Sequence, residues 1–164
     1  MNYSRMTSLL ASALLLSTLS LSAFAAGSIE LKSIAEVEKN TTNKDGKKET
    51  KRIIAKKVPP DGIVIYTTSF KNVGNKPAGN IVINNPIAEH TEYVADSAMG
   101  YNTDITFSAD AGKNFASPEK LTVTSADGKV RPALASDYTH IKWTYKGELA
   151  EGKTSEVSFK AKVK

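Results

Sequence analysis

The chain contains no cysteine, and this absence limits what it can do. No disulfide can form, and no lipid can be attached through a cysteine. Histidine is scarce as well, with only His90 and His140. Two distant histidines without any cysteine are a poor basis for a zinc site, and His140 lies on the strand face opposite to Trp143, which indicates a surface residue. We therefore expect no metal ligands and no cofactor.

Motifs of common enzyme classes are also missing. The chain has no Gly-x-Ser-x-Gly sequence and no phosphate-binding glycine loop. A Ser-His-Asp set can be drawn from any chain this rich in serine, so it carries no weight. Four aspartates near predicted turns lack the spacing of an EF-hand loop, which indicates turn capping rather than calcium binding: Asp104, Asp110, Asp127 and Asp137. We predict that the protein is not an enzyme and has no catalytic residues.

Only one long apolar run is present, from Met6 to Phe24. It follows Arg5 and ends in Ala23-Phe24-Ala25-Ala26, which together predict a secretory signal peptide over residues 1–26. Its most apolar part, Leu9 to Leu16, is well short of the ~20 residues that span a bilayer, so a membrane anchor is the weaker interpretation. We expect a periplasmic or secreted protein without a transmembrane segment after signal removal. Export without cysteine favours a bacterial periplasmic protein.

The charge balance is mildly positive, at +5 for the chain. Removal of the signal peptide takes away Arg5 alone, which leaves 21 basic residues against 17 acidic ones. This excess does not indicate nucleic-acid binding. One basic run is the candidate contact with an anionic partner: Lys47, Lys48, Lys51, Arg52, Lys56 and Lys57. The alternative is a solvated face that protects an edge strand against aggregation; Lys160, Lys162 and Lys164 form a second basic group on one strand face.

Short period-two segments separated by turn residues predict an all-β fold. Residues 155–163 alternate up to the C-terminus, and residues 63–71 place Val64, Tyr66, Thr68 and Phe70 on the core face. Trp143 lies mid-strand and is expected to anchor the core. The pair Asp45-Gly46 predicts a hairpin, and a helical turn is predicted near 133–138. We predict a single immunoglobulin-like antiparallel β-sandwich of about seven to nine strands over residues 27–164.

Several segments support a family resemblance over roughly Pro60 to Lys164. The first reads Tyr-Thr-Thr-Ser-Phe-Lys-Asn-Val-Gly-Asn-Lys-Pro-Ala over 66–78, and Asn85-Pro86 ends the next strand. Further segments are 91–94, 97–98, 141–143, 149–152 and 157–159, with Glu151 where proline is common. This pattern resembles the bacterial "conserved repeat domain" family, domain of unknown function eleven. The resemblance implies an immunoglobulin-like sandwich in exported or cell-surface proteins, with no enzyme activity and no fixed ligand.

The segment from Ser108 to Phe115 resembles an Asp-box, with Asn114 in place of threonine. In that motif an aspartate caps the N–H groups of a turn, and a glycine supplies a positive φ angle. We therefore predict that Asp110 has a structural role and is neither a sugar ligand nor a metal ligand.

Two functions remain open at this point. We expect a non-catalytic exported structural or interaction module of the bacterial cell envelope, with another envelope protein or an anionic envelope polymer as candidate partners. The alternative is a carbohydrate- or envelope-polymer-binding module that uses a basic face and exposed aromatic residues, for which the candidates are Tyr93, Tyr101 and Phe115. Clustering of these rings at the surface would favour the alternative, whereas their burial favours the first function.

Overall fold

The structure is a computed structural model that describes residues 28–164, so the predicted signal peptide over 1–26 lies outside the described residues. This part of the chain forms thirteen strands and two short 3-10 helices. The elements are β1 (Ile29–Thr42), β2 (Lys48–Ile54), β3 (Ile63–Asn72), β4 (Ala78–Gly79), β5 (Val82–Pro86), β6 (Thr91–Tyr93), β7 (Met99–Gly100), β8 (Thr103–Ser108), η1 (Pro118–Lys120), β9 (Thr122–Thr124), β10 (Val130–Pro132), η2 (Ala135–Asp137), β11 (His140–Tyr145), β12 (Glu148–Leu149) and β13 (Thr154–Val163).

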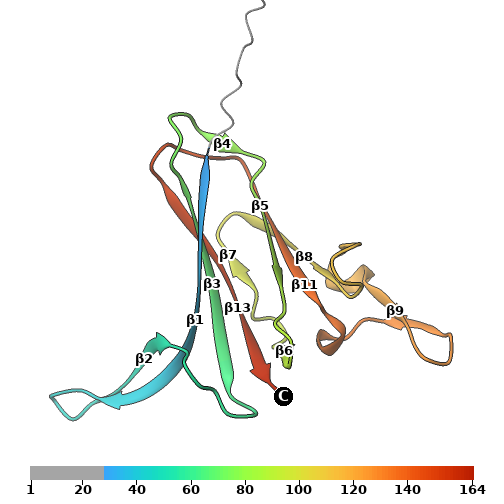
Figure 1. Cartoon of the computed structure of the whole chain (residues 1–164), viewed down its shortest axis with the longest axis horizontal. Helices are drawn as coiled ribbons and strands as arrows, with labels where there is room; N and C mark the ends of the chain where they lie inside the picture. The colour runs from blue at the N-terminus through green and yellow to red at the C-terminus, as the bar shows by residue number, and fades with distance from the viewer. Residues whose placement is uncertain (1–27) are drawn as a thin grey trace, which may run out of the picture.

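Two antiparallel sheets face each other and enclose the core (Figure 1). The larger has the order β2-β1-β3-β13-β6, with β7 also paired to β13, and the smaller has the order β5-β11-β8. The predicted immunoglobulin-like β-sandwich is thus confirmed as an architecture. Seven of the strands in the described residues have five or more residues, within the predicted range, and the other six are pieces of two or three residues.

The C-terminal strand β13 occupies a central position between β3 and β6. Its register with β3 runs from Thr154↔Lys71 to Lys162↔Ile63. The predicted alternation is confirmed, because Val157, Phe159 and Ala161 are all buried. A strand in the middle of a sheet with one face on the core needs this period of two.

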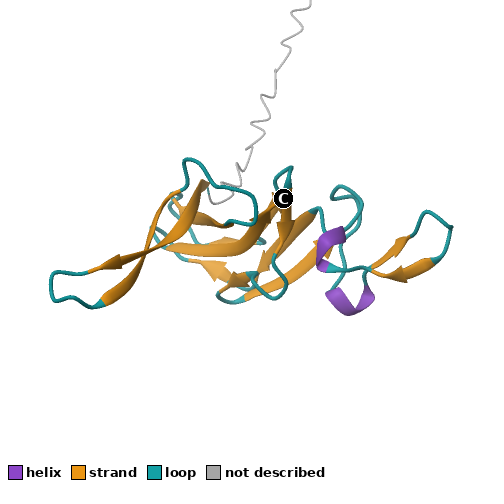
Figure 2. Cartoon of the chain, turned by 90° about the horizontal axis from the view of Figure 1, so that it is seen from below, coloured by secondary structure: helices purple, strands orange, loops and turns teal. Residues whose placement is uncertain are grey.

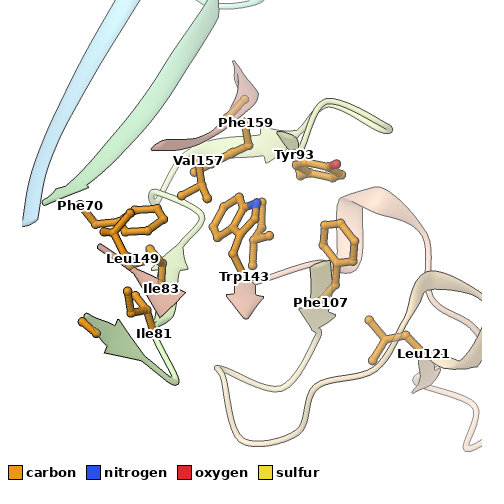
Figure 3. Packing of buried hydrophobic residues seen from close by; sticks show 13 residues of the cluster. Phe70, Ile81, Ile83, Tyr93, Phe107, Leu121, Trp143, Leu149, Val157 and Phe159 are labelled. Carbon is orange, nitrogen blue, oxygen red and sulfur yellow. The ribbon is translucent and has the colours of Figure 1, made fainter. Parts of the chain in front are cut away.

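Trp143 of β11 lies at the centre of the core, where its side chain is fully buried (Figure 3). Its ring centroid is 6.2 Å from that of Phe159 in the opposite sheet. The predicted core position of Trp143 is therefore confirmed. Phe70 and Ile141 are also fully buried in this cluster.

Strand β3 buries residues on both of its faces. Val64, Thr68 and Phe70 are buried as predicted. Ile65 points to the opposite face and is also buried, with 2% of its surface exposed. It lies in register between Glu36 of β1 and Lys160 of β13. Ile65 is thus flanked by a paired strand on each side, and the alternation alone does not predict its burial.

Asn72 at the end of β3 is a fully buried polar residue. Its carboxamide nitrogen donates to the carbonyl oxygens of Lys76 at 2.7 Å and Leu149 at 2.8 Å. Its side-chain oxygen accepts a hydrogen bond from the Gly74 amide at 2.9 Å. The Asn-Val-Gly turn therefore ties the end of β3 to β12, a contact between residues that are 77 positions apart in the chain.

Strand β1 belongs half to the sandwich and half to a projecting hairpin. Ile29 to Glu36 pairs with β3, and Glu36 to Thr42 pairs with β2. The β1–β2 hairpin, defined here as residues 36–54, therefore extends beyond the edge of the sandwich (Figures 1 and 2). The predicted turn is confirmed: Gly46 has a φ of 76°, and the Asn43 side-chain oxygen accepts from the Lys47 amide at 2.9 Å.

An insertion between β8 and β11 forms the opposite end of the molecule (Figure 2). It contains η1, the β9–β10 hairpin and η2, and η2 confirms the helical turn predicted near 133–138. Arg131 and Asp137 form a two-point ion pair at 2.7 and 2.9 Å, which closes the base of the hairpin. Asp137 also accepts from the Leu134 amide at 2.7 Å, so its carboxylate caps η2.

Candidate functional site

The basic run is the first candidate site, and all six of its side chains are exposed. The structure places Lys47 at the end of the hairpin turn, Lys48, Lys51 and Arg52 on β2, and Lys56 and Lys57 in the segment that leads to β3. Because neighbouring residues of a strand point to opposite faces, Lys51 and Arg52 face opposite sides. The run is therefore a projecting arm that is basic on both faces rather than a single flat patch.

Glu38 of β1 joins the two predicted basic groups. Its carboxylate oxygen lies 4.0 Å from the Arg52 side chain and 3.8 Å from the Lys160 ammonium group. Lys51 pairs with Glu49 on its own strand at 2.7 Å. Such exposed ion pairs contribute at most about 1 kcal/mol each to stability. The basic side chains can therefore leave these carboxylates and bind another anionic group.

A groove of about 650 Å³ lies beside Arg52. Glu156 and Ser158 of β13 line it, and Met99 and Tyr101 contribute from β7 and the turn that follows. Tyr101 is 82% exposed, which is unusual for a tyrosine, and Met99 is 67% exposed. The groove is the place where the predicted basic run and a predicted exposed aromatic residue meet.

The predicted aromatic platform is wrong for Tyr93, which is only 4% exposed. Strand β6 pairs with β13 and directs this ring into the core, 5.3 Å from the Phe107 ring. Burial raises the pKa of the Tyr93 hydroxyl above its ordinary value. Phe115 is half-buried, and the Lys142 ammonium group lies 4.3 Å from its centroid. Among the three predicted residues only Tyr101 is freely exposed, so they form no common platform.

Asp110 has the structural role that the Asp-box predicts. Its carboxylate accepts hydrogen bonds from the Ser108 hydroxyl at 2.7 Å and from the amides of Lys113 at 3.1 Å and Asn114 at 2.9 Å. These bonds, with the Asn114 amide first, hold the pKa of Asp110 well below its usual range. Gly112 has the predicted positive φ, at 80°. The prediction that Asp110 caps a turn is confirmed.

The histidines and acidic residues do not converge. His90 is exposed, and His140 is half-buried, with its Nδ1 atom 3.2 Å from the Thr139 hydroxyl. Within residues 28–164 no three His, Cys, Asp or Glu side chains are grouped so that they could hold a metal ion. Over the same residues, no helix has the length and apolar character needed to cross a membrane.

No family model matches the chain, and no curated protein matches it. The resemblance to the conserved repeat domain family therefore stays a prediction, which the sandwich fold agrees with but does not test.

Proposed function

We propose that the protein is a non-catalytic exported module of the bacterial cell envelope that contacts an anionic partner through its β1–β2 hairpin. The observation that carries the proposal is the exposure of six basic side chains on or directly after an arm that projects beyond the sandwich. The hairpin contributes little to the core, because Ile53 and Ile54 are 44% and 58% exposed. None of the residues in the hydrophobic core cluster comes from this hairpin, so its side chains are available for contact.

The charge of the arm suits recruitment more than tight binding. Exposed charges raise the rate of encounter with an oppositely charged surface, and salt screens this attraction over about 10 Å at 0.1 M. Each exposed pair contributes at most about 1 kcal/mol, so several basic residues must act together. Lys48 and Lys51 lie on opposite faces of β2, with Lys47 at the turn, so a partner must reach both faces of the arm to contact all three.

The test compares two triple variants with the same change in net charge. Lys47, Lys48 and Lys51 are changed to Glu in one, and Lys113, Lys120 and Lys129, at the opposite end, in the other. Binding is measured by cosedimentation with peptidoglycan and by retention on immobilised lipopolysaccharide, at several salt concentrations. We expect the hairpin variant to lose most of the binding and the control to retain most of it, with wild-type binding falling as salt rises.

Unfolding of the hairpin variant or salt-insensitive binding would contradict the proposal. Surface charge changes should alter the free energy of unfolding by no more than about 0.5 kcal/mol per site. Thermal denaturation of each variant therefore serves as the folding control.

Export is tested separately. Mass spectrometry of the protein recovered from its native host should show an N-terminus near Gly27. Intact Met1 on protein retained in the cytoplasm would contradict an envelope location.

A second candidate function is carbohydrate binding, and the groove beside Tyr101 is the observation that favours it. An exposed aromatic ring offers an apolar face to a sugar ring, while Arg52, Glu156 and Ser158 offer polar groups to its hydroxyl or carboxylate substituents. Tyr101→Ala should then reduce retention on an acidic polysaccharide such as polygalacturonate. Val130→Ala, at an exposed residue of the far end, is the control. Equal retention of the two variants and the wild type would exclude this function for the groove.

A further inference from the structure

A second cavity lies at the end of the sandwich opposite to the hairpin. It has a volume of about 520 Å³ and is bounded by the β6–β7 loop, β8 and the insertion that carries η1 and η2. Tyr93, Phe107 and Tyr138 contribute aromatic rings to its wall. Figure 3 shows Tyr93 and Phe107 side by side at this end of the core. Volume and lining are those of a small-molecule site, which is concave, mostly apolar and provided with few polar groups.

The three rings form one compact aromatic cluster that reaches the surface through Tyr138. Ring centroids are 4.6 Å apart for Phe107 and Tyr138, 5.3 Å for Tyr93 and Phe107, and 5.7 Å for Tyr93 and Tyr138. Tyr93 and Phe107 are buried, whereas Tyr138 is half-buried. The Tyr93 hydroxyl accepts a hydrogen bond from the Ala98 amide at 3.0 Å, which fixes one wall of the cavity. The aromatic surface is therefore held in place without a ligand.

The polar contribution to the cavity is acidic. Asp96 lines it, and Glu119 follows Pro118, another lining residue. Neither carboxylate takes part in any ion pair between residues 28 and 164. Burial is the largest cause of the raised pKa of Tyr138, and the negative charges of Glu119 and Asp96 raise it further. The cavity thus combines the half-buried ring of Tyr138 with the carboxylate of Asp96, which has no ion-pair partner among residues 28–164.

We propose that this cavity binds an organic cation with an apolar body, namely an alkylammonium or quaternary ammonium group. The negative face of an aromatic ring attracts a cation within about 6 Å, and this attraction becomes stronger as the site becomes drier. Asp96 adds a direct charge at the mouth, and Leu134, 60% exposed, supplies apolar surface at the rim. A neutral apolar molecule would gain only the burial of its surface. The proposal is independent of the hairpin and of its anionic partner.

The test uses choline and its neutral carbon isostere, 3,3-dimethyl-1-butanol, as probes of the same shape. Amide shifts of the isotope-labelled protein are followed by NMR during titration with each probe. We expect saturable shifts confined to the β6–β7 loop, β8 and η2, with a dissociation constant in the millimolar range for so small a ligand. Choline should bind several-fold more tightly than the alcohol.

Two variants test the assigned groups. Asp96→Asn should weaken choline several-fold and leave the alcohol unchanged, whereas Tyr138→Leu should weaken choline by a similar factor. Asp127→Asn, in the exposed turn between β9 and β10, is the matched control and should change neither. Equal affinity for the two probes would show a merely apolar pocket. That result, shifts located elsewhere, or no saturation by about 50 mM choline would overturn the proposal.

Discussion

Replacement of Trp143 by alanine removes the largest fully buried side chain from the centre of the sandwich. Loss of a buried tryptophan costs about 3–5 kcal/mol. The variant no longer gains the free energy of removing the indole surface from water on folding, and a cavity remains in the folded state. A domain of this size has a stability of only about 5–15 kcal/mol, so the variant should lose a large share of it.

The indole nitrogen of Trp143 makes a finer prediction possible. It is buried and has no hydrogen-bond partner among residues 28–164. An unpartnered buried donor costs about 1–3 kcal/mol, and Trp143→Phe removes that cost while it creates a smaller cavity than alanine does. We expect the phenylalanine variant to lose less than half of what the alanine variant loses.

The measurement is urea denaturation followed by far-UV circular dichroism, because Trp143 is the only tryptophan and its fluorescence disappears with it. An alanine variant with an unchanged midpoint and slope would refute the central position of this side chain. A phenylalanine variant as unstable as the alanine variant would show that the indole nitrogen carries no penalty.

Three further predictions concern single side chains. Asn72→Ala should cost about 2–4 kcal/mol in urea denaturation, because it leaves the Lys76 and Leu149 carbonyl groups unpartnered; a cost under about 0.5 kcal/mol would contradict this. Asp110→Ala should lower the thermal midpoint by roughly 4 °C. Because folding lowers the pKa of Asp110, its contribution to the free energy of unfolding should be present above about pH 3.9 and lost as the pH falls further. If calcium stabilised the wild type but not this variant, Asp110 would be a metal ligand instead. Folding raises the pKa of Tyr93. Its contribution to the free energy of unfolding is therefore present below about pH 10, and it is lost as the pH rises through the higher pKa of the folded state. Alkaline denaturation should therefore be less steep in Tyr93→Phe, and identical alkaline profiles would contradict the burial of its hydroxyl.

Sequence patterns alone predict those features whose cause is local. The alternation in β13 defines which residues face the core, since successive side chains of a strand point to opposite faces. The Asp45-Gly46 turn defines the hairpin, and the spacing of the Asp-box brings Asp110 to the amides that it caps. The exposure of the basic run also follows from sequence, because closely spaced lysines are too costly to bury.

Only the tertiary structure decides features that depend on distant partners. Tyr93 lies in a strand of three residues, too short for a period of two to define its buried face, and its pairing with β13 places it in the core. Asn72 acquires its role through Leu149, which is 77 residues away. The cavity that is lined by Asp96, Phe107 and Tyr138 is likewise formed by distant segments, which meet only after both sheets have packed. Local preferences describe the faces of each strand, but which strands become neighbours depends on the free energy of the whole core.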